Sequence, residues 1–437
     1  GTYTGTGASG NLVETGFEPA WLMIKNADSA HDWVIFDNKR DVANPRDSKL
    51  SPNTNGTEFS STSIEIDFAS NGFIIQGTDD AINDTNETHI YLAIAADPDT
   101  TTPTVENSFD VVTYDGQNSG SGQTRDIISD FKPDFVWIKN RNVNTVRHQL
   151  FDSVRGVGNV LMSDGTDAES FDSTSLISFN DNGVTLGYNG NVDLSGRSYV
   201  AWMWKAGDHD DNLPQINTEG SIDSVVSVND EAGFSIVKYT GNGTQGATVG
   251  HSLSSPPELI IWKNTDATAN WLVYSPLIGS DSEWLYLNTT NSKQDSGSQN
   301  EYPTNKTNPT SDVVTINGAG SSNNINISGE NTIMYCFTSI IGYQKIDSYS
   351  GNNSNDRLFN IGFAARFVMI KKTNGNSNWQ TFDSARGGNA QLDLNSSDVE
   401  YTGGSTPIEF VSNGFKIKTN YTTYNATGGE YIYLAIK

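Results

Sequence analysis

The sequence predicts an all-β protein made of tandem antiparallel β-sandwich repeats. Short runs of β-branched and aromatic residues are separated by turn dipeptides such as Asn-Gly, Thr-Gly and Gly-Gly. Runs of Ala, Leu, Glu and Lys at helical spacing are almost absent. One arrangement of motifs also occurs four times along the 437 residues, which is typical of a repeat architecture.

Each repeat is recognised by motifs that come in the same order. A Tyr-x-Gly opens it, at Tyr3, Tyr114, Tyr239 and Tyr349. A frame ending in lysine follows, as "PAWLMIK", "PDFVWIK", "PELIIWK" and "ARFVMIK". Next come "WVIFDNKR", "HQLFDSVR", "WLVYSPL" and "WQTFDSAR", and an apolar strand such as "YLAIA" or "YVAWMW" closes the repeat.

These motifs predict four repeats of about seven strands each. The repeats span residues 1–98, 108–207, 233–342 and 343–437, and linkers are predicted at 99–107 and 208–232. Whether two repeats share one larger sandwich stays open.

Composition excludes several classes of partner. The formal net charge of −26 and the pI of about 4.3 repel nucleic-acid phosphates and anionic lipids, so we expect neither nucleic-acid binding nor membrane insertion. No window approaches the roughly 20 apolar residues of a membrane span. The single cysteine, Cys336, lies in the apolar run "IMYCF" and is predicted to be buried and inert.

All four repeats resemble a known family, most strongly over about 108–342. "KPDFVWIKNR", "HQLFDSVRG" and "SGRSYVAWMWKAG" are similar to repeats of tail-fibre-like proteins of marine bacteriophages, and "AGFSIVKYTGNGTQGATVGHSL" is similar to the companion unit in those proteins. The resemblance implies a lectin-like sandwich of the concanavalin or jelly-roll kind in a virion appendage. It implies a virion or extracellular location, and as partners a host cell-surface glycan or receptor and other virion or fibre subunits. A homo-oligomer stays open.

"HQLFDSVRG" contains residue types of a catalytic site, but comparison among the repeats favours a structural role. His148 stands where the other repeats have Trp33, Trp271 and Trp379. The Asp and Arg three residues apart recur and predict a structural ion pair or turn cap, at Asp37, Arg40, Asp152, Arg155, Asp383 and Arg386. The repeated lysines are predicted to end a strand and extend into solvent, with anion binding as the alternative, at Lys25, Lys139, Lys263 and Lys371.

Two further patterns carry carboxylates. Glu65 and Asp67 alternate on one strand face, as in sandwich glycosidases, but Ser70 and Asn71 stand where the second glutamate is needed, which favours a solvated face. Four residues of "DHDDNLPQINTE" occupy positions 1, 3, 5 and 12 of a calcium loop, namely Asp208, Asp210, Asn212 and Glu219. Position 6 is Leu213 instead of glycine, so a flexible acidic linker is predicted, with calcium as the alternative cofactor.

The sequence therefore predicts a non-enzymatic appendage protein without catalytic residues, whose binding loops are expected at 52–63 or 289–312. The alternatives are a purely structural capsid-decorating, fibre or surface-filament module, and a polysaccharide hydrolase. Only Gly1 and Thr2 precede the first Tyr, so we expect an open strand edge in the first repeat that an upstream domain or a neighbouring subunit covers.

Overall fold

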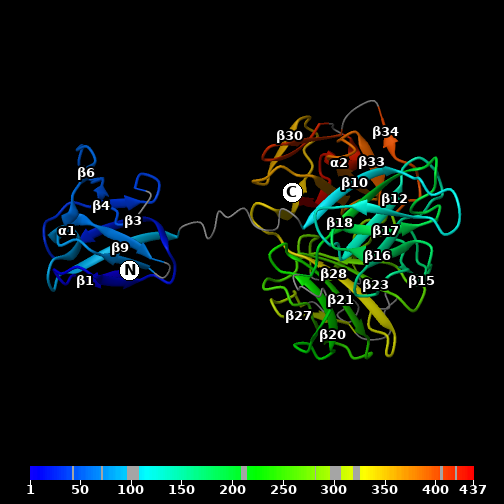
Figure 1. Ribbon diagram of the computed structural model, residues 1–437, viewed down its shortest axis with the longest axis horizontal. Helices are drawn as coiled ribbons and strands as arrows, with labels where there is room; N and C mark the ends of the chain where they lie inside the picture. Colours follow the sequence, from blue (N-terminus) through cyan, green and yellow to red (C-terminus); the bar gives the residue numbers. More distant parts are fainter. Residues whose placement is uncertain are drawn as a thin grey trace. The chain divides into compact units, whose positions relative to one another are not determined.

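The structure is a computed structural model (Figure 1). It describes residues 1–41, 44–69, 72–95, 108–207, 214–280, 282–295, 307–317, 325–403, 407–418 and 421–437. Within these ranges the regular structure is almost all β, with two four-residue α-helices, α1 (Asp80–Asn83) and α2 (Thr422–Asn425), and one 3-10 turn (Thr62–Ile64). The all-β prediction is confirmed. None of the described helices has the length and apolar character needed to cross a membrane.

The chain divides into two compact units, residues 1–103 and 104–437. The first unit holds the first repeat. One of its sheets has the order β1 (Thr2–Thr4), β9 (Thr88–Ala95), β3 (Pro19–Asn26) and β4 (Val34–Asp37). The other has the order β2 (Asn11–Glu14), β8 (Gly72–Ile75) and β7 (Ile66–Ala69), and a hairpin joins β5 (Ser48–Lys49) to β6 (Phe59–Ser60). A core of its own lies between the sheets.

The second unit holds the other three repeats, which Figure 1 shows side by side in cyan to green, green to yellow and orange to red. The second repeat has a sheet of β10 (Phe109–Asp115), β18 (Ser198–Trp204), β12 (Phe135–Asn140) and β13 (Gln149–Asp152). Its opposite sheet is β11 (Thr124–Ile128), β17 (Gly183–Gly187) and β16 (Leu176–Asn180), and β14 (Asn159–Val160) pairs with β15 (Ser170–Phe171).

The fourth repeat follows the same plan. Its larger sheet has the order β29 (Gln344–Ser350), β37 (Glu430–Ile436), β31 (Phe367–Lys372), β32 (Trp379–Asp383), β33 (Ala390–Asp393) and β34 (Tyr401–Thr402). The smaller sheet is β30 (Arg357–Asn360), β36 (Gly414–Ile417) and β35 (Ile408–Val411).

The third repeat has an eight-stranded sheet. Its order is β19 (Gln215–Asn217), β20 (Ser224–Asn229), β21 (Phe234–Thr240), β28 (Asn331–Phe337), β23 (Leu259–Asn264), β24 (Leu272–Tyr274), β25 (Glu283–Tyr286) and β26 (Gln294–Asp295), and β22 (Ala247–Gly250) pairs with β27 (Val313–Ile316). The predicted linker 208–232 is therefore wrong for β19 and β20, which extend this sheet by pairing onto β21. The linker 99–107 and residues 208–213 lie outside the described residues.

The structure explains why every repeat opens with Tyr-x-Gly. The tyrosine hydroxyl donates to a backbone carbonyl in all four repeats: Tyr3 to Ile82 O (2.5 Å), Tyr114 to Val192 O (2.7 Å), Tyr239 to Ile325 O (2.7 Å) and Tyr349 to Tyr424 O (2.5 Å). A Cβ on the glycine would lie only 2.0–2.4 Å from another carbonyl oxygen, at Gly5, Gly116, Gly241 and Gly351. Any larger residue would push the opening strand off the sandwich.

Candidate functional site

The largest described core of the second unit is shared among its three repeats. Alternate residues of each closing strand point away from the repeat's own sandwich and pack against the other two repeats. They are at most 4% exposed: Val200, Trp202 and Trp204 from β18, Ile333, Tyr335 and Phe337 from β28, and Ile432, Leu434 and Ile436 from β37. We call this the inner face of each repeat.

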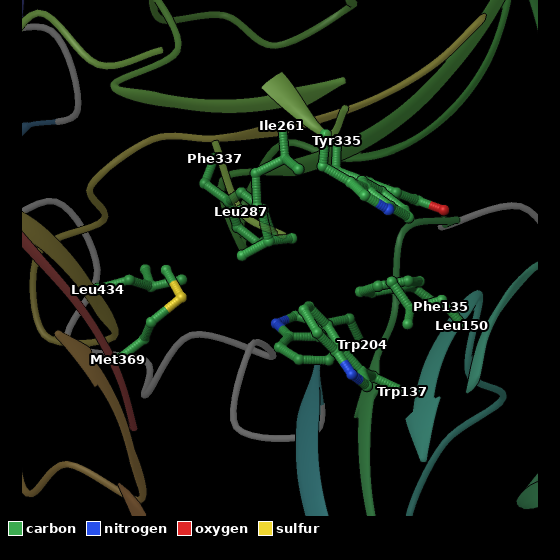
Figure 2. Close-up of a pocket in the computed structure, with 11 residues that line it drawn as sticks. Phe135, Trp137, Leu150, Trp204, Ile261, Leu287, Tyr335, Phe337, Met369 and Leu434 are labelled. Carbon is green, nitrogen blue, oxygen red and sulfur yellow. The ribbon is translucent and has the colours of Figure 1, made fainter. Parts of the chain in front are cut away.

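At the centre of the inner faces lies an apolar cavity of about 20 Å³. Figure 2 shows side chains from all three repeats pointing toward it, for example Trp137, Ile261 and Met369. Ligand sites usually measure about 300–1,000 Å³ and contain a few polar groups. The cavity is therefore a packing gap at the meeting point of three repeats.

A ring of hydrogen bonds joins the repeats in one direction. The indole Nε1 of Trp271 donates to Met162 O (2.9 Å), and that of Trp379 donates to Tyr286 O (2.9 Å). His148 Nε2 lies 3.1 Å from Asp393 O and closes the ring. The third repeat thus contacts the second, the fourth contacts the third, and the second contacts the fourth.

His148 takes the place of tryptophan in this ring. Trp137 Nε1 donates to His148 Nδ1 (2.8 Å), which leaves Nε2–H as the donor to Asp393 O. Burial, with Lys139 nearby, lowers the pKa of His148 well below its ordinary value, so the imidazole stays neutral. The arrangement is that of a structural histidine.

The repeated lysines form a second ring, and the prediction that they extend into solvent is wrong for three of them. Lys139, Lys263 and Lys371 are fully buried. Each donates to a carbonyl of its own repeat and to one of the neighbouring repeat: Lys139 to Ser397 O (3.3 Å), Lys263 to Thr166 O (3.1 Å) and Lys371 to Thr290 O (3.1 Å). These carbonyls lie four residues beyond the acceptors of the first ring. Only Lys25, in the first unit, is half-exposed.

The Asp and Arg of the "FDS" motif form a capped turn with an ion pair in three repeats. The arginine backbone N donates to one aspartate oxygen (2.8–2.9 Å) and its Nε to the other: Arg40 with Asp37 (2.6 Å), Arg155 with Asp152 (2.5 Å) and Arg386 with Asp383 (2.6 Å). A glutamate then binds Nη1 of each arginine: Glu58, Glu169 and Glu400.

In the second unit the same aspartates accept a bond from the inner face of the next repeat. Tyr335 OH donates to Asp152 (2.7 Å), and Trp202 Nε1 donates to Asp383 (2.9 Å). The third repeat has Ser275 in place of the aspartate, and the fourth has Leu434 in place of the donor. Both substitutions concern the junction between the fourth and third repeats: the donor and the acceptor of this bond are replaced together there, so neither is left buried without its partner.

The other carboxylates predicted from the sequence lie apart from these contacts. Asp67 of β7 accepts from Gln76 Nε2 (2.8 Å) and is half-buried. Glu65 is also half-buried, but it lies before β7, at the end of the 3-10 turn. Of the calcium-loop residues, Asp208, Asp210 and Asn212 lie outside the described residues. Glu219 lines an open hollow of about 390 Å³ with Asp230 and Asp312.

One group of possible metal ligands occurs in the first unit. His31, Asp80 and Asp84 offer ligand atoms within 4.8 Å of one another. Acidic side chains often lie this close on a strongly acidic surface, so we assign no ion to them.

An open hollow of about 400 Å³ lies where the second and fourth repeats meet. Tyr401, 65% exposed, forms part of its wall together with Gln391, Asn144 and the exposed Asp398. Glu400 also lines the hollow and binds Arg141 (2.9 Å) and Arg386 (3.0 Å). Burial alone would raise the pKa of Glu400, but the two guanidinium groups hold it below its ordinary value. The hollow thus has an exposed aromatic ring, several polar groups and one carboxylate held by two ion pairs.

The sequence predicts binding loops at 52–63 or 289–312, and Tyr401 lies in neither of them. Residues 296–306 of the second loop lie outside the described residues. An aromatic residue in "SSDVEYTGG", between polar residues and before a turn, was the available signal, but the Asn144 side of the hollow comes from another repeat.

A family model described as "Domain of unknown function (DUF7483)" matches residues 1–98 and 105–437. The chain belongs to this family. The break between the matched ranges coincides with the division of the chain into two compact units. No curated protein matches the sequence.

Proposed function

We propose that this DUF7483 protein is a non-enzymatic component of a virion appendage and binds a host-surface glycan in the hollow beside Tyr401. The observation that carries the proposal is the exposed tyrosine ring next to amide and carboxylate groups. A sugar presents an apolar face that stacks on such a ring and hydroxyl groups that such polar groups bind.

The surroundings support a neutral saccharide as the ligand. Asp398 and Glu400 line the hollow, and the chain carries a formal net charge of −26, which disfavours phosphorylated or sulfated ligands. The two ion pairs of Glu400 fix the start of β34, so that Tyr401 is held in place before a ligand arrives. A site held in advance loses less conformational entropy on binding.

The test is a glycan array, followed by binding to whole host cells, with wild-type chain and the variant Tyr401→Ala. Loss of a central aromatic anchor costs about 2 kcal/mol or more, so we expect about a thirtyfold loss of affinity. The control is Phe171→Ala, which removes a 71% exposed ring on β15 away from the hollow and is expected to bind as wild type. Wild-type chain that binds no glycan and no host cell would refute the proposal.

The second candidate is a purely structural module, such as a fibre or capsid-decorating subunit. It is favoured by the closed ring of three repeats, whose conspicuous residues all serve packing. Wild-type chain that binds neither glycan nor host cell, together with particles that fail to assemble without it, would favour this alternative.

A further inference from the structure

We propose that the first repeat associates with the first repeats of two further copies of this chain. The contact surface is its inner face, formed by β9, β3 and β4. The product is a ring of three first repeats in trans, equivalent to the ring that the second, third and fourth repeats form within one chain.

The inner face of the first repeat is apolar but open. On β9, Ile90, Leu92 and Ile94 are 38%, 52% and 55% exposed. By their position relative to the opening tyrosine, they correspond to the triplets of β18, β28 and β37 that are at most 4% exposed. Three such side chains alternating along one strand are a patch of the kind that marks a protein contact.

The neighbouring strands show the same difference. On β3, Trp21 and Met23 are half-exposed, whereas the corresponding Phe135 and Trp137 of β12 are buried. Before β4, Trp33 is half-exposed, although the corresponding Trp271 and Trp379 are fully buried.

The polar groups of the ring are also present in the first repeat. Lys25 Nζ donates to Asn26 O (2.5 Å) and Ser29 O (3.4 Å) of its own repeat, and its counterparts add a carbonyl of a neighbouring repeat. The backbone N of Trp33 makes the same hydrogen bond as that of its counterpart Trp271: Trp33 N donates to Asn53 Oδ1 (3.0 Å), and Trp271 N donates to Asn288 Oδ1 (2.9 Å).

This shared bond fixes which residues would accept in trans. Asn53 aligned with Asn288 places Ser51 at the position of Tyr286 and Asn55 at that of Thr290, which are the two acceptors in the second unit. In the proposed ring, Trp33 Nε1 donates to Ser51 O of the next copy, and Lys25 Nζ donates to Asn55 O.

Three copies satisfy this geometry because each inner face contacts two others. In the second unit the three inner faces already cover one another, so they offer no surface for the first repeat. A dimer would leave one junction of the ring open, whereas three copies close it.

The test is sedimentation equilibrium of the full chain, of Leu92→Asp and of Leu12→Asp. Leu12 lies on β2 in the opposite sheet and is 54% exposed, so Leu12→Asp introduces the same charge at similar exposure outside the inner face. We expect three times the chain mass of 47.4 kDa for wild type and for Leu12→Asp, and the mass of a single chain for Leu92→Asp.

A second variant keeps the proposal open to refutation if Leu92→Asp fails to fold. Leu92→Tyr copies Tyr335, whose hydroxyl donates to Asp152 of the next repeat, and is expected to donate to Asp37 of the next copy. It should tighten the trimer about tenfold or more. Wild-type chain that stays single or forms only dimers, or a Leu92→Tyr variant that associates no better than wild type, would overturn the proposal.

Discussion

Asp383→Ala removes the acceptor at one junction of the intrachain ring. Asp383 accepts from Arg386 N (2.9 Å), Arg386 Nε (2.6 Å) and Trp202 Nε1 (2.9 Å), and the side chains of Asp383 and Arg386 are both fully buried. The variant leaves a buried guanidinium with Glu400 as its remaining anionic partner (3.0 Å) and an indole N–H without its acceptor.

The expected loss of unfolding free energy in Asp383→Ala follows from the burial of these groups. Removing one partner of a buried ion pair costs about 3–5 kcal/mol, because the other charge stays away from water. A lost hydrogen bond to a charged acceptor costs about 1.5–3 kcal/mol, but the two losses share one carboxylate and are not additive. We expect the free energy of unfolding of the second unit to fall by about 4 kcal/mol.

The assay is urea unfolding followed by tryptophan fluorescence. The control is Asp347→Ala, since Asp347 pairs with Lys345 at 3.5 Å on the surface, with both side chains about two-fifths exposed. Exposed pairs contribute at most about 1 kcal/mol. A loss of less than about 1 kcal/mol in Asp383→Ala would refute the idea that this carboxylate holds the ring together.

Three further predictions concern buried groups of the second unit. Burial lowers the pKa of Lys371 to about 7, so above pH 7 the unfolded chain binds more protons than the folded chain. The free energy of unfolding should therefore rise from pH 7 toward pH 10. In thermal unfolding scans, Lys371→Met should reduce the dependence of this free energy on pH by up to about 1.4 kcal/mol per pH unit. Burial holds the pKa of His148 far below its ordinary value, so below about pH 6.5 the unfolded chain takes up a proton that the folded chain does not, and the free energy of unfolding falls. The variant His148→Gln should therefore lose less stability than wild type between pH 6.5 and 5. Cys336 is fully buried and burial raises its pKa, so a thiol reagent should label it only after unfolding; fast labelling of native chain would contradict this packing.

The local part of this structure could be predicted from the sequence. The four repeats, their β character and the Asp–Arg turn depend on residues a few positions apart, such as Asp152 and Arg155. The comparison among repeats also predicts that His148 occupies a tryptophan position. In the structure, His148 makes the hydrogen bond to the neighbouring repeat that tryptophan makes in the third and fourth repeats.

The contacts between repeats could not be predicted in the same way. Lys139 is buried because its third acceptor, Ser397 O, comes from another repeat, 258 residues away. One signal was available: "YVAWMW" is apolar at every position, and a strand with one face in solvent alternates. The run "IYLAIA" of the first repeat carries the same signal, and its Ile90, Leu92 and Ile94 are not covered by the described residues of the first unit.

The inner face is closed within the chain in three repeats and, in the proposed trimer, between chains in the first. The mass of the unmodified full chain at sedimentation equilibrium, across a concentration series, tests it most directly. We expect a monomer–trimer equilibrium whose mass approaches three times 47.4 kDa as concentration rises. A mass that stays at 47.4 kDa up to the solubility limit would contradict it.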